Sequence, residues 1–271
     1  MAKERNIDTI AITDHSTTSG IQEAKAAGKE NDVKIVPGIE LVSSYGGIKF
    51  HLLGLFIDET AAQLKSMMFS YHAKRAKLMI SLLKELEKMG IPIPKSRSAI
   101  ELSMIKLIKF YGTQLPTEQA KRIVCAIKHT NQYKSLNQLA IPFDYASGVI
   151  HKSCGLAVIP HLSRLPMIEQ DQYEFVSALK EIGLDGIETC HPEYAKEQIE
   201  FYSSIADQMK LFKTGGSDYH GKNPGVVELG QCVTPVEHMK KMEEISQTTY
   251  NAQQSISCLN ASKWRHQIRH N

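Results

Sequence analysis

Short apolar runs that stop at polar or charged residues recur in the first and last parts of the chain. The expected strands are 9–13, 33–36, 48–57, 156–161, 186–189 and 211–214. Between them, apolar residues at helical spacing predict helices at about 21–30, 172–182 and 193–209. This strand–helix–strand alternation, with polar residues at strand ends, predicts an α/β fold built on a parallel sheet or barrel.

The middle of the chain has a different pattern, because its apolar residues recur at helical spacing without a strand signal. From about 61 to 90 the repeat is carried by Leu64, Met67, Met68, Tyr71, Leu78, Leu82, Leu83 and Leu86. Gly90 and Pro92 end this helical run. We therefore expect a discontinuous barrel domain at 1–95 and 145–250, a helical insertion subdomain at 96–144 and a polar C-terminal extension at 251–271.

Composition adds few constraints. A chain of 271 residues is long enough for one large domain with a sizeable core. Its net charge of +3 demands neither a nucleic-acid nor a membrane partner, and no apolar run approaches the roughly 18 residues of a membrane span. No signal peptide is visible at the start. Five scattered cysteines without a CxxC pair predict no disulfide framework and favour a reducing cytoplasm.

Residues that can bind metal ions recur beside the predicted strands. They are Asp14, His15, Glu40, His161, His191, Asp218 and His220 at or just beyond strand ends, and His51 near the start of its own strand. In a parallel barrel the carboxyl ends of the strands converge on one face, where barrel enzymes assemble their sites. Histidine nitrogens with carboxylate oxygens suit zinc, manganese or iron(II). Each residue alone is more often structural, and the repetition from strand to strand favours a metal site.

Six segments together resemble the motifs of one family. They are AITDH at 11–15, VPGIE at 36–40, HLLG at 51–54, AVIPH at 157–161, GIETCHP at 186–192 and GSDYH at 216–220. In this order they resemble the PHP (polymerase and histidinol phosphatase) family of metal-dependent phosphoesterases. The resemblance implies a distorted (β/α)7 barrel and up to three divalent ions, Mn²⁺, Zn²⁺ or Fe²⁺. The branch it resembles hydrolyses phosphate monoesters of nucleotides, as nucleoside 3′,5′-bisphosphates or 5′-phosphorylated short oligonucleotides, through metal-activated hydroxide.

The resemblance also implies a role for each matching residue. The expected metal ligands are Glu40, bridging two ions; His51 and His161, completing one of those sites; Asp218, on the other ion; and His15 and His220, on a third. His191 is expected to contact the substrate or leaving group, and His191 or His220 to protonate the leaving oxygen. Asp14 is the remaining expected catalytic residue, because it would orient a ligand or a nearby histidine. Arg75 is an expected phosphate contact, and a solvated helix residue is the equal alternative.

Two features depart from the family pattern. Family members open with a strand ending in Asp-x-His-x-His-Thr, whereas this sequence starts at Met1 in the helix that follows, and no later His-x-His replaces the motif. A truncated barrel that lacks its first strand and retains six of the usual nine ligand positions is therefore expected. The 96–144 region also lacks the Gly-Arg-Pro-His-like residues with which the family's insertion helps to bind nucleotide phosphate.

Three hypotheses follow. The first is an active phosphoesterase. The second is a truncated, catalytically impaired homologue that folds and binds metal, and the third is a metal-binding regulatory module. The expected partner is a nucleotide or short oligonucleotide substrate, with no stable nucleic-acid complex and no membrane; the oligomeric state is left open.

Overall fold

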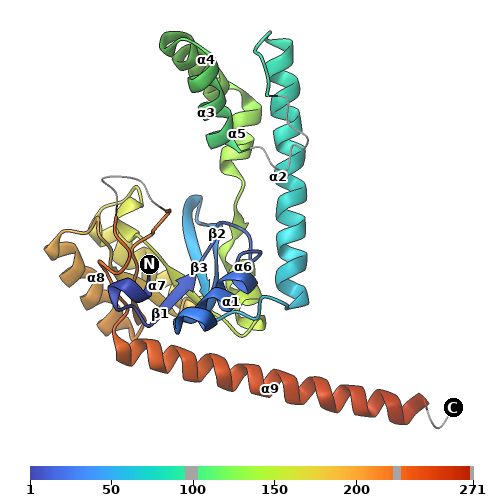
Figure 1. Ribbon diagram of the computed structural model, residues 1–271, viewed down its shortest axis with the longest axis vertical. Coiled ribbons are helices and arrows are strands. Elements are labelled where there is room, and N and C mark those ends of the chain that lie inside the picture. The colour runs from blue at the N-terminus through green and yellow to red at the C-terminus, as the bar shows by residue number, and fades with distance from the viewer. Residues whose placement is uncertain (95–102, 222–226, 269–271) are drawn as a thin grey trace. The chain divides into compact units, whose positions relative to one another are not determined.

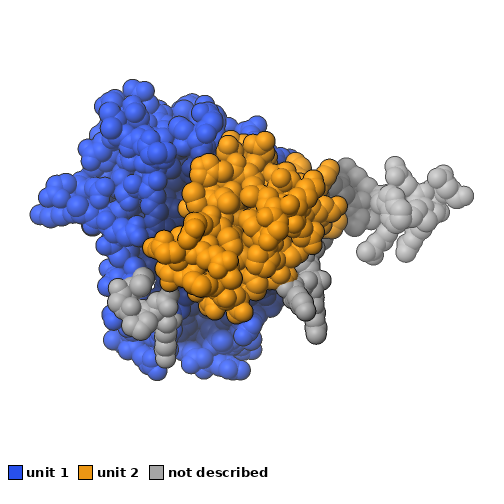
Figure 2. All heavy atoms as spheres, turned by 90° about the horizontal axis from the view of Figure 1, so that it is seen from above, with its two compact units in different colours: residues 1–64, 142–271 blue, residues 65–141 orange. Residues whose placement is uncertain are grey.

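The computed structural model describes residues 1–94, 103–221 and 227–268, with side chains described up to residue 255. The chain divides into two compact units. The α/β unit comprises Met1–Leu64 and Pro142–Asn271, and the helical unit comprises Lys65–Ile141 (Figure 2).

The α/β unit alternates strands and helices over most of its length (Figure 1). Its first segment holds the 3-10 turn Lys3–Arg5, β1 (Thr9–Ile12), α1 (Ile21–Asn31), β2 (Lys34–Tyr45), β3 (Ile48–Leu55) and the start of α2 (Ala62–Lys88). Its second segment holds α6 (Phe143–Lys152), β5 (Leu156–Ile159), the 3-10 turn Leu162–Arg164, α7 (Glu169–Glu181), β6 (Gly186–Cys190), α8 (Lys196–Met209), β7 (Phe212–Gly215) and α9 (Val236–Ile268). The short β4 (Ile141–Pro142) joins the helical unit to α6.

The strands form one seven-stranded sheet in the order β1-β2-β3-β5-β6-β7, with β4 pairing with β2. β1 is parallel to β2, and β5, β6 and β7 are parallel to one another. β3 is antiparallel to both of its neighbours. The sheet is therefore mixed, which corrects the expectation of a parallel sheet.

A tight hairpin between β2 and β3 accounts for the antiparallel strand. Gly46 and Gly47 both adopt left-handed backbone angles, with φ of 56° and 79°. Two consecutive residues with positive φ form the turn whose twist matches that of the paired strands, and glycine adopts this conformation without strain. The hairpin extends β2 far beyond the expected 33–36, so Glu40 lies inside the strand and pairs with Leu53.

The core of the α/β unit lies around the central strands. All four residues of β5 are buried, and so are the first four residues of β6. Parallel strands covered by helices on both faces have this continuous burial. The helices α7 and α8 contribute buried Val176, Leu179, Ile205 and Ala206.

The helical unit contains most of α2, with α3 (Met104–Gln114), α4 (Thr117–His129) and α5 (Asn131–Gln138). Its core joins Met79, Leu82 and Leu86 of α2 to Leu107 and Tyr111 of α3. This packing explains why the unit starts at Lys65, well before the residue 96 that we expected. Part of the expected insertion, residues 96–102, lies outside the described residues.

The long helix α9 runs through the boundary that we expected between the domain and a C-terminal extension at 251. Gln253 beyond that boundary accepts a hydrogen bond from Cys154 Sγ at 3.3 Å, so the helix packs there against the turn between α6 and β5. None of the described helices has an apolar stretch long enough to cross a membrane.

Candidate metal centre

One buried carboxylate, Glu40 on β2, touches three histidines that come from separate parts of the chain. Its Oε1 lies 2.6 Å from His51 Nδ1 and 3.3 Å from His161 Nε2, and its Oε2 lies 3.2 Å from His15 Nδ1. Burial alone would raise the pKa of Glu40, but hydrogen bonds from His161 and His51 and the nearby imidazoles hold it well below its usual range. The carboxylate is therefore ionised near neutral pH.

The backbone after β1 brings His15 beside Glu40. Glu40 N donates to Asp14 O at 3.2 Å, and Ser16 N donates to Glu40 O at 2.8 Å. These two hydrogen bonds continue the parallel pairing of β1 and β2 past the end of β1. Asp14 itself lies beside Gly20, where a β-carbon would come within 2.8 Å of Asp14 Oδ2. A larger residue at position 20 would therefore displace this carboxylate.

The turn that carries His161 is held by a second buried carboxylate. His161 follows β5 in a left-handed conformation, with φ of 34°, which is unfavourable for a residue with a β-carbon. Glu188 on the adjacent strand β6 accepts a hydrogen bond from His161 N at 2.7 Å. Glu188 also lies against Gly216, where a β-carbon would be 2.8 Å from its Oε1. One side chain thus contacts both the His161 turn and the segment leading to Asp218.

Sequence reasoning missed Glu188, although a single charged residue within the apolar run 186–189 was a usable signal. Burial is the main cause that raises its pKa to about 8, and the charges of Asp218 and Glu40 add to the effect. Glu188 is 5% exposed, so its carboxyl group is mostly protonated in the metal-free protein at neutral pH.

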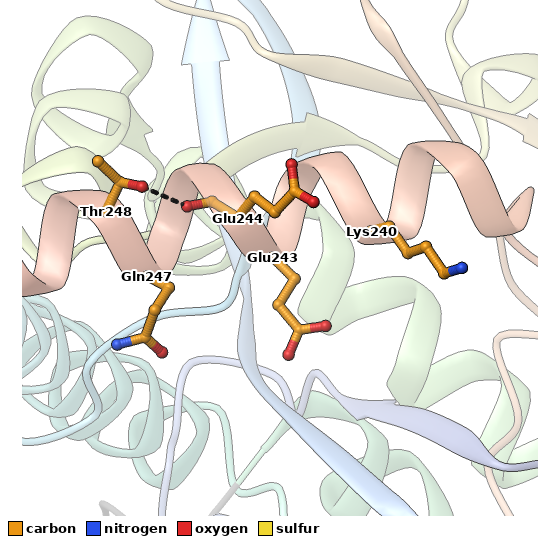
Figure 3. Close-up of a pocket in the computed structure, with 5 residues that line it drawn as sticks. All are labelled: Lys240, Glu243, Glu244, Gln247 and Thr248. Atoms are coloured by element: carbon orange, nitrogen blue, oxygen red, sulfur yellow. Dashed lines mark hydrogen bonds between the residues drawn. The ribbon is translucent and has the colours of Figure 1, made fainter.

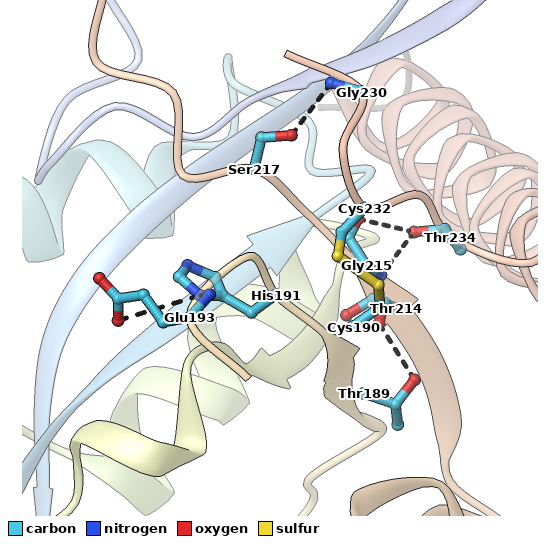
Figure 4. Close-up of a disulfide and its surroundings, with 10 residues drawn as sticks. All are labelled: Thr189, Cys190, His191, Glu193, Thr214, Gly215, Ser217, Gly230, Cys232 and Thr234. Carbon is cyan, nitrogen blue, oxygen red and sulfur yellow. Dashed lines mark hydrogen bonds and ion pairs between the residues drawn. A yellow bond between two sulfur atoms is a disulfide. The ribbon is translucent and has the colours of Figure 1, made fainter. Parts of the chain in front are cut away.

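His191 follows β6 and has a defined tautomer. Glu193 N donates to His191 Nδ1 at 3.1 Å, and the Glu193 carboxylate lies 3.9 Å from the same nitrogen (Figure 4). Burial, followed by the charge of Arg164, lowers the pKa of His191, which favours the neutral ring. Since Nδ1 accepts a hydrogen bond, the proton of the neutral ring is on Nε2. Nε2 is buried and has no partner among the described residues. His191 therefore presents an unused N–H donor, with its ring 6.1 Å from that of His161.

His220 has the opposite arrangement. Its Nδ1 lies 2.7 Å from the carbonyl oxygen of Asp218, which can only accept, so Nδ1 carries the proton. The lone pair of Nε2 is then available to a metal ion, since ligating histidines usually donate their other N–H in this way. The His220 ring lies 5.7 Å from that of His15, between centroids.

Asp218 is paired with a residue that sequence reasoning also missed. Arg164 donates to Asp218 Oδ2 at 3.0 Å and, through two nitrogens, to both carboxylate oxygens of Glu193 at 2.9 Å. These hydrogen bonds raise the pKa of Arg164 above its already high value, Glu193 contributing most. Arg164 comes three residues after His161, and this spacing was the available signal. The contact places a permanent positive charge beside Asp218.

The donor atoms around Glu40 fit a divalent metal ion. Those of His15, Glu40 and His51 all lie within 4.8 Å of one another, and His161 contacts the same carboxylate. Atoms bound to one ion at about 2.0–2.2 Å lie roughly 3 Å apart. The contacts between His51, His161 and Glu40 are 2.6 to 3.3 Å, which is close to that spacing. Arg75, in contrast, belongs to the helical unit.

A disulfide lies directly beside this centre. Cys190, the residue before His191, is joined to Cys232, and their Cα atoms are 5.5 Å apart (Figure 4). Thr234 Oγ1 accepts from Gly215 N at 3.1 Å, and Gly230 N donates to Ser217 Oγ at 3.0 Å. The scattered cysteines predicted no disulfide framework, and this bridge corrects that expectation: the two cysteines are 42 positions apart in the sequence and come together only in the fold.

A shallow groove on α9 is distinct from the metal centre. It is lined by Lys240, Glu243, Glu244, Gln247 and Thr248, all from one helix (Figure 3). None of the candidate ligands contributes to it.

The chain is similar in sequence to several known enzymes. No family model matches the chain. A phosphoribosyl 1,2-cyclic phosphate 1,2-diphosphodiesterase of Eggerthella lenta is 31% identical over 241 residues, covering 84% of this chain and 89% of the relative. A 5′-3′ exoribonuclease of Haemophilus influenzae is 27% identical and covers 85% of each chain. A 3′,5′-nucleoside bisphosphate phosphatase of Chromobacterium violaceum is 27% identical and covers 82% of this chain and 80% of the relative.

The fold has a counterpart among solved structures. A Chromobacterium violaceum protein described as an amidohydrolase superposes with a TM-score of 0.73 at 22% identity, covering 90% of this chain and 88% of the other. At this level of identity the match establishes a shared fold.

Proposed function

Because the chain belongs to the PHP family of metal-dependent phosphoesterases, we propose that it hydrolyses phosphate monoesters of nucleotides. Nucleoside 3′,5′-bisphosphates and 5′-phosphorylated short oligonucleotides are the proposed substrates; one relative is named a 3′,5′-nucleoside bisphosphate phosphatase and another a 5′-3′ exoribonuclease. The observation that carries the proposal is the Glu40 carboxylate in contact with His15, His51 and His161. An ionised buried carboxylate surrounded by imidazole nitrogens offers the ligand atoms that divalent cations of this class bind.

In this proposal Glu40, His51 and His161 would hold one ion, Glu40 and Asp218 would hold a second, and His15 and His220 would hold a third. The fixed Nδ1–H of His220 supports its role, since it leaves Nε2 as the ligand atom. Bound divalent ions would activate water at neutral pH and neutralise charge on the reacting phosphate. Ligation of Asp218 would compete with its ion pair to Arg164.

His191 is proposed to hydrogen-bond the substrate. Its buried Nε2–H has no partner among the described residues, and a phosphate or leaving-group oxygen would accept from it. Arg164, held in place by Glu193, is proposed to attract the phosphate towards Asp218. We propose that the mixed sheet belongs to the family's distorted barrel, with these side chains on one face.

Release of phosphate or of mononucleotides by the purified chain with added Mn²⁺ tests the function. The substrate panel should include a nucleoside 3′,5′-bisphosphate, a 5′-phosphorylated oligoribonucleotide and phosphoribosyl 1,2-cyclic phosphate, which the Eggerthella lenta relative is named for. We expect Glu40→Gln to lower kcat/KM by at least about 10³-fold, because the amide cannot bind a cation as a carboxylate does. The amount of bound metal, measured on the same samples, should also be lower in Glu40→Gln than in the wild type.

The matched control is Glu197→Gln, which removes an exposed carboxylate from α8 of the same unit. It should leave activity and metal content unchanged. Full activity in Glu40→Gln would overturn the proposed site. A wild-type chain that binds Mn²⁺ but hydrolyses none of the substrates would favour the impaired-homologue hypothesis instead.

A further inference from the structure

Charge is distributed very unevenly between the two units. The 77 residues of the helical unit contain 14 lysines and arginines but only four acidic residues, a net charge of +10. The other 194 residues contain 18 basic and 25 acidic residues, a net charge of −7. The overall charge of +3 conceals this difference. A helical unit with this excess of positive charge attracts polyanions.

Part of the positive charge forms a stripe on α2. At about 100° per residue, Lys74, Lys77, Lys84 and Lys88 fall within an arc of roughly 80°, over a length of about 21 Å. All four are exposed. Met79, Leu82 and Leu86 on another side of the helix are fully buried in the core, so the stripe faces away from it.

Acidic neighbours do little to neutralise the stripe. Lys88 lies 3.8 Å from Glu85. Lys74, Lys77 and Lys84 form no ion pair with any residue that the structure describes. Like charges three or four residues apart on a helix are mildly destabilising, so the pairs Lys74/Lys77 and Lys84/Lys88 slightly lower the stability of α2. A phosphate partner would remove that repulsion.

An exposed aromatic side chain lies on α2 before the stripe begins. Phe69 is 77% exposed, and it lies five residues before Lys74 and about 140° around the helix from it. Single-stranded nucleic acids bind where cationic side chains follow the backbone and aromatic rings stack with bases. A mononucleotide carries its phosphates on one sugar and cannot extend along 21 Å.

We propose that this stripe on α2 binds the phosphate backbone of a single-stranded oligonucleotide through Lys74, Lys77, Lys84 and Lys88. This inference rests on the proposed function and narrows it, because it makes the oligonucleotide, and not the mononucleotide, the preferred substrate class. It also revises the expectation that the chain forms no complex with nucleic acid.

The test compares the triple variant K74A/K77A/K84A with K29A/K180A/K241A, which removes the same charge from exposed positions on α1, α7 and α9. Two substrates are assayed: adenosine 3′,5′-bisphosphate and a 5′-phosphorylated ten-nucleotide single-stranded RNA. We expect K74A/K77A/K84A to lower kcat/KM for the RNA at least about tenfold, with the bisphosphate unchanged within twofold. The slope of log kcat/KM for RNA against log salt should become shallower by about 2, roughly 0.7 for each lost contact. The control should match the wild type.

Binding of the same RNA without turnover, followed by fluorescence anisotropy in EDTA, separates this inference from the proposed function. If RNA binding depends on these lysines but no substrate is hydrolysed, the proposed function is contradicted and the proposed role of the stripe is supported. If the bisphosphate is hydrolysed and K74A/K77A/K84A does not change the RNA kinetics, the proposed role of the stripe is wrong and the proposed function is unaffected. An equal loss of kcat/KM for the RNA and the bisphosphate in K74A/K77A/K84A would also contradict the proposed role of the stripe. So would lysine-dependent binding to phosphatidylserine vesicles without RNA binding, because the surface would then be a membrane contact.

Discussion

At the scale of single residues, Glu188 links two of the turns that carry candidate ligands. It accepts from the His161 backbone and lies against Gly216, two residues before Asp218. Positive φ values at His161 (34°) and Asp218 (47°) mean that both turns are held in conformations that L residues seldom adopt. A carboxyl group between the two turns can offset part of that strain through hydrogen bonding.

Two substitutions at Glu188 should therefore affect the stability of the metal-free protein in different ways. Glu188→Ala should lower the free energy of unfolding by about 2–4 kcal/mol, because it leaves a cavity and a buried N–H without an acceptor. Glu188→Gln keeps an acceptor and removes a group whose pKa is raised to about 8.

The pH dependence of the second variant follows from the sign of that shift. A folded-state pKa above the unfolded value means that the wild type loses stability as pH rises from about 4.5 to 8. Glu188→Gln lacks this loss, so its stability relative to the wild type should increase across that range. Urea unfolding at pH 5 and pH 8 measures it, and a difference independent of pH would contradict the assignment.

His191 gives a second prediction at this scale. Its Nδ1 is engaged by Glu193 N, so we expect it to contact substrate and not metal. His191→Ala should lower kcat about 10²- to 10³-fold while the metal content stays at the wild-type level. His129→Ala, at an exposed position in the helical unit, is the control. Loss of metal from His191→Ala would show that it is a ligand instead.

At the scale of elements, the core of the helical unit contains an unusual polar atom. Tyr111 on α3 is fully buried, and its hydroxyl group has no partner among the described residues. An unpaired buried hydroxyl costs free energy, since water would have hydrogen-bonded it in the unfolded chain. Burial among apolar side chains also disfavours the charged phenolate, so the pKa of Tyr111 is raised.

Tyr111→Phe should therefore leave the stability of the helical unit unchanged or raise it by up to about 1 kcal/mol. Leu86→Ala in the same core should lower it by about 2–5 kcal/mol, because it leaves a cavity. Differential scanning calorimetry of the two variants measures both effects. A clear destabilisation by Tyr111→Phe would indicate a hydrogen bond to the hydroxyl.

At the scale of the whole molecule, the Cys190–Cys232 bridge closes a loop that contains α8 and β7. Cross-linking residues 42 apart lowers the entropy of the unfolded chain, which corresponds to about 4 kcal/mol in the chain-entropy model and to 2–4 kcal/mol in typical cases. The bridge also holds the strand end before His191 beside the segment that contacts Ser217.

Cys232→Ser should therefore lower the free energy of unfolding by about 2–4 kcal/mol under oxidising conditions. With a reducing agent present, wild type and variant should differ by less than about 1 kcal/mol. Cys125→Ser, which changes an exposed free cysteine, is the control. Equal stabilities of wild type and Cys232→Ser without reductant would mean that the bridge does not form in solution.

The sequence by itself determined the family and the α/β class. The motif residues are local, and segments such as VPGIE and AVIPH are readable without knowing the fold; the resemblance agrees with a relative 31% identical over 241 residues. Helical periodicity likewise located the helical region, because side chains three and four residues apart share one face of a helix. The candidate ligands were named for the same reason, since their chemistry and position relative to the strands are visible in the chain.

Only the tertiary structure decided how these pieces meet. Antiparallel β3, the early start of the helical unit at α2, and the Cys190–Cys232 pair all depend on contacts between residues distant in sequence. Glu188 and Arg164 were missed because their roles arise from a neighbouring strand and a neighbouring turn. The contrast between +10 and −7 was present in the composition but had no meaning until the unit boundaries were known. Local patterns specify elements and residue chemistry, whereas burial, pairing and charge segregation are properties of residues brought together by the fold.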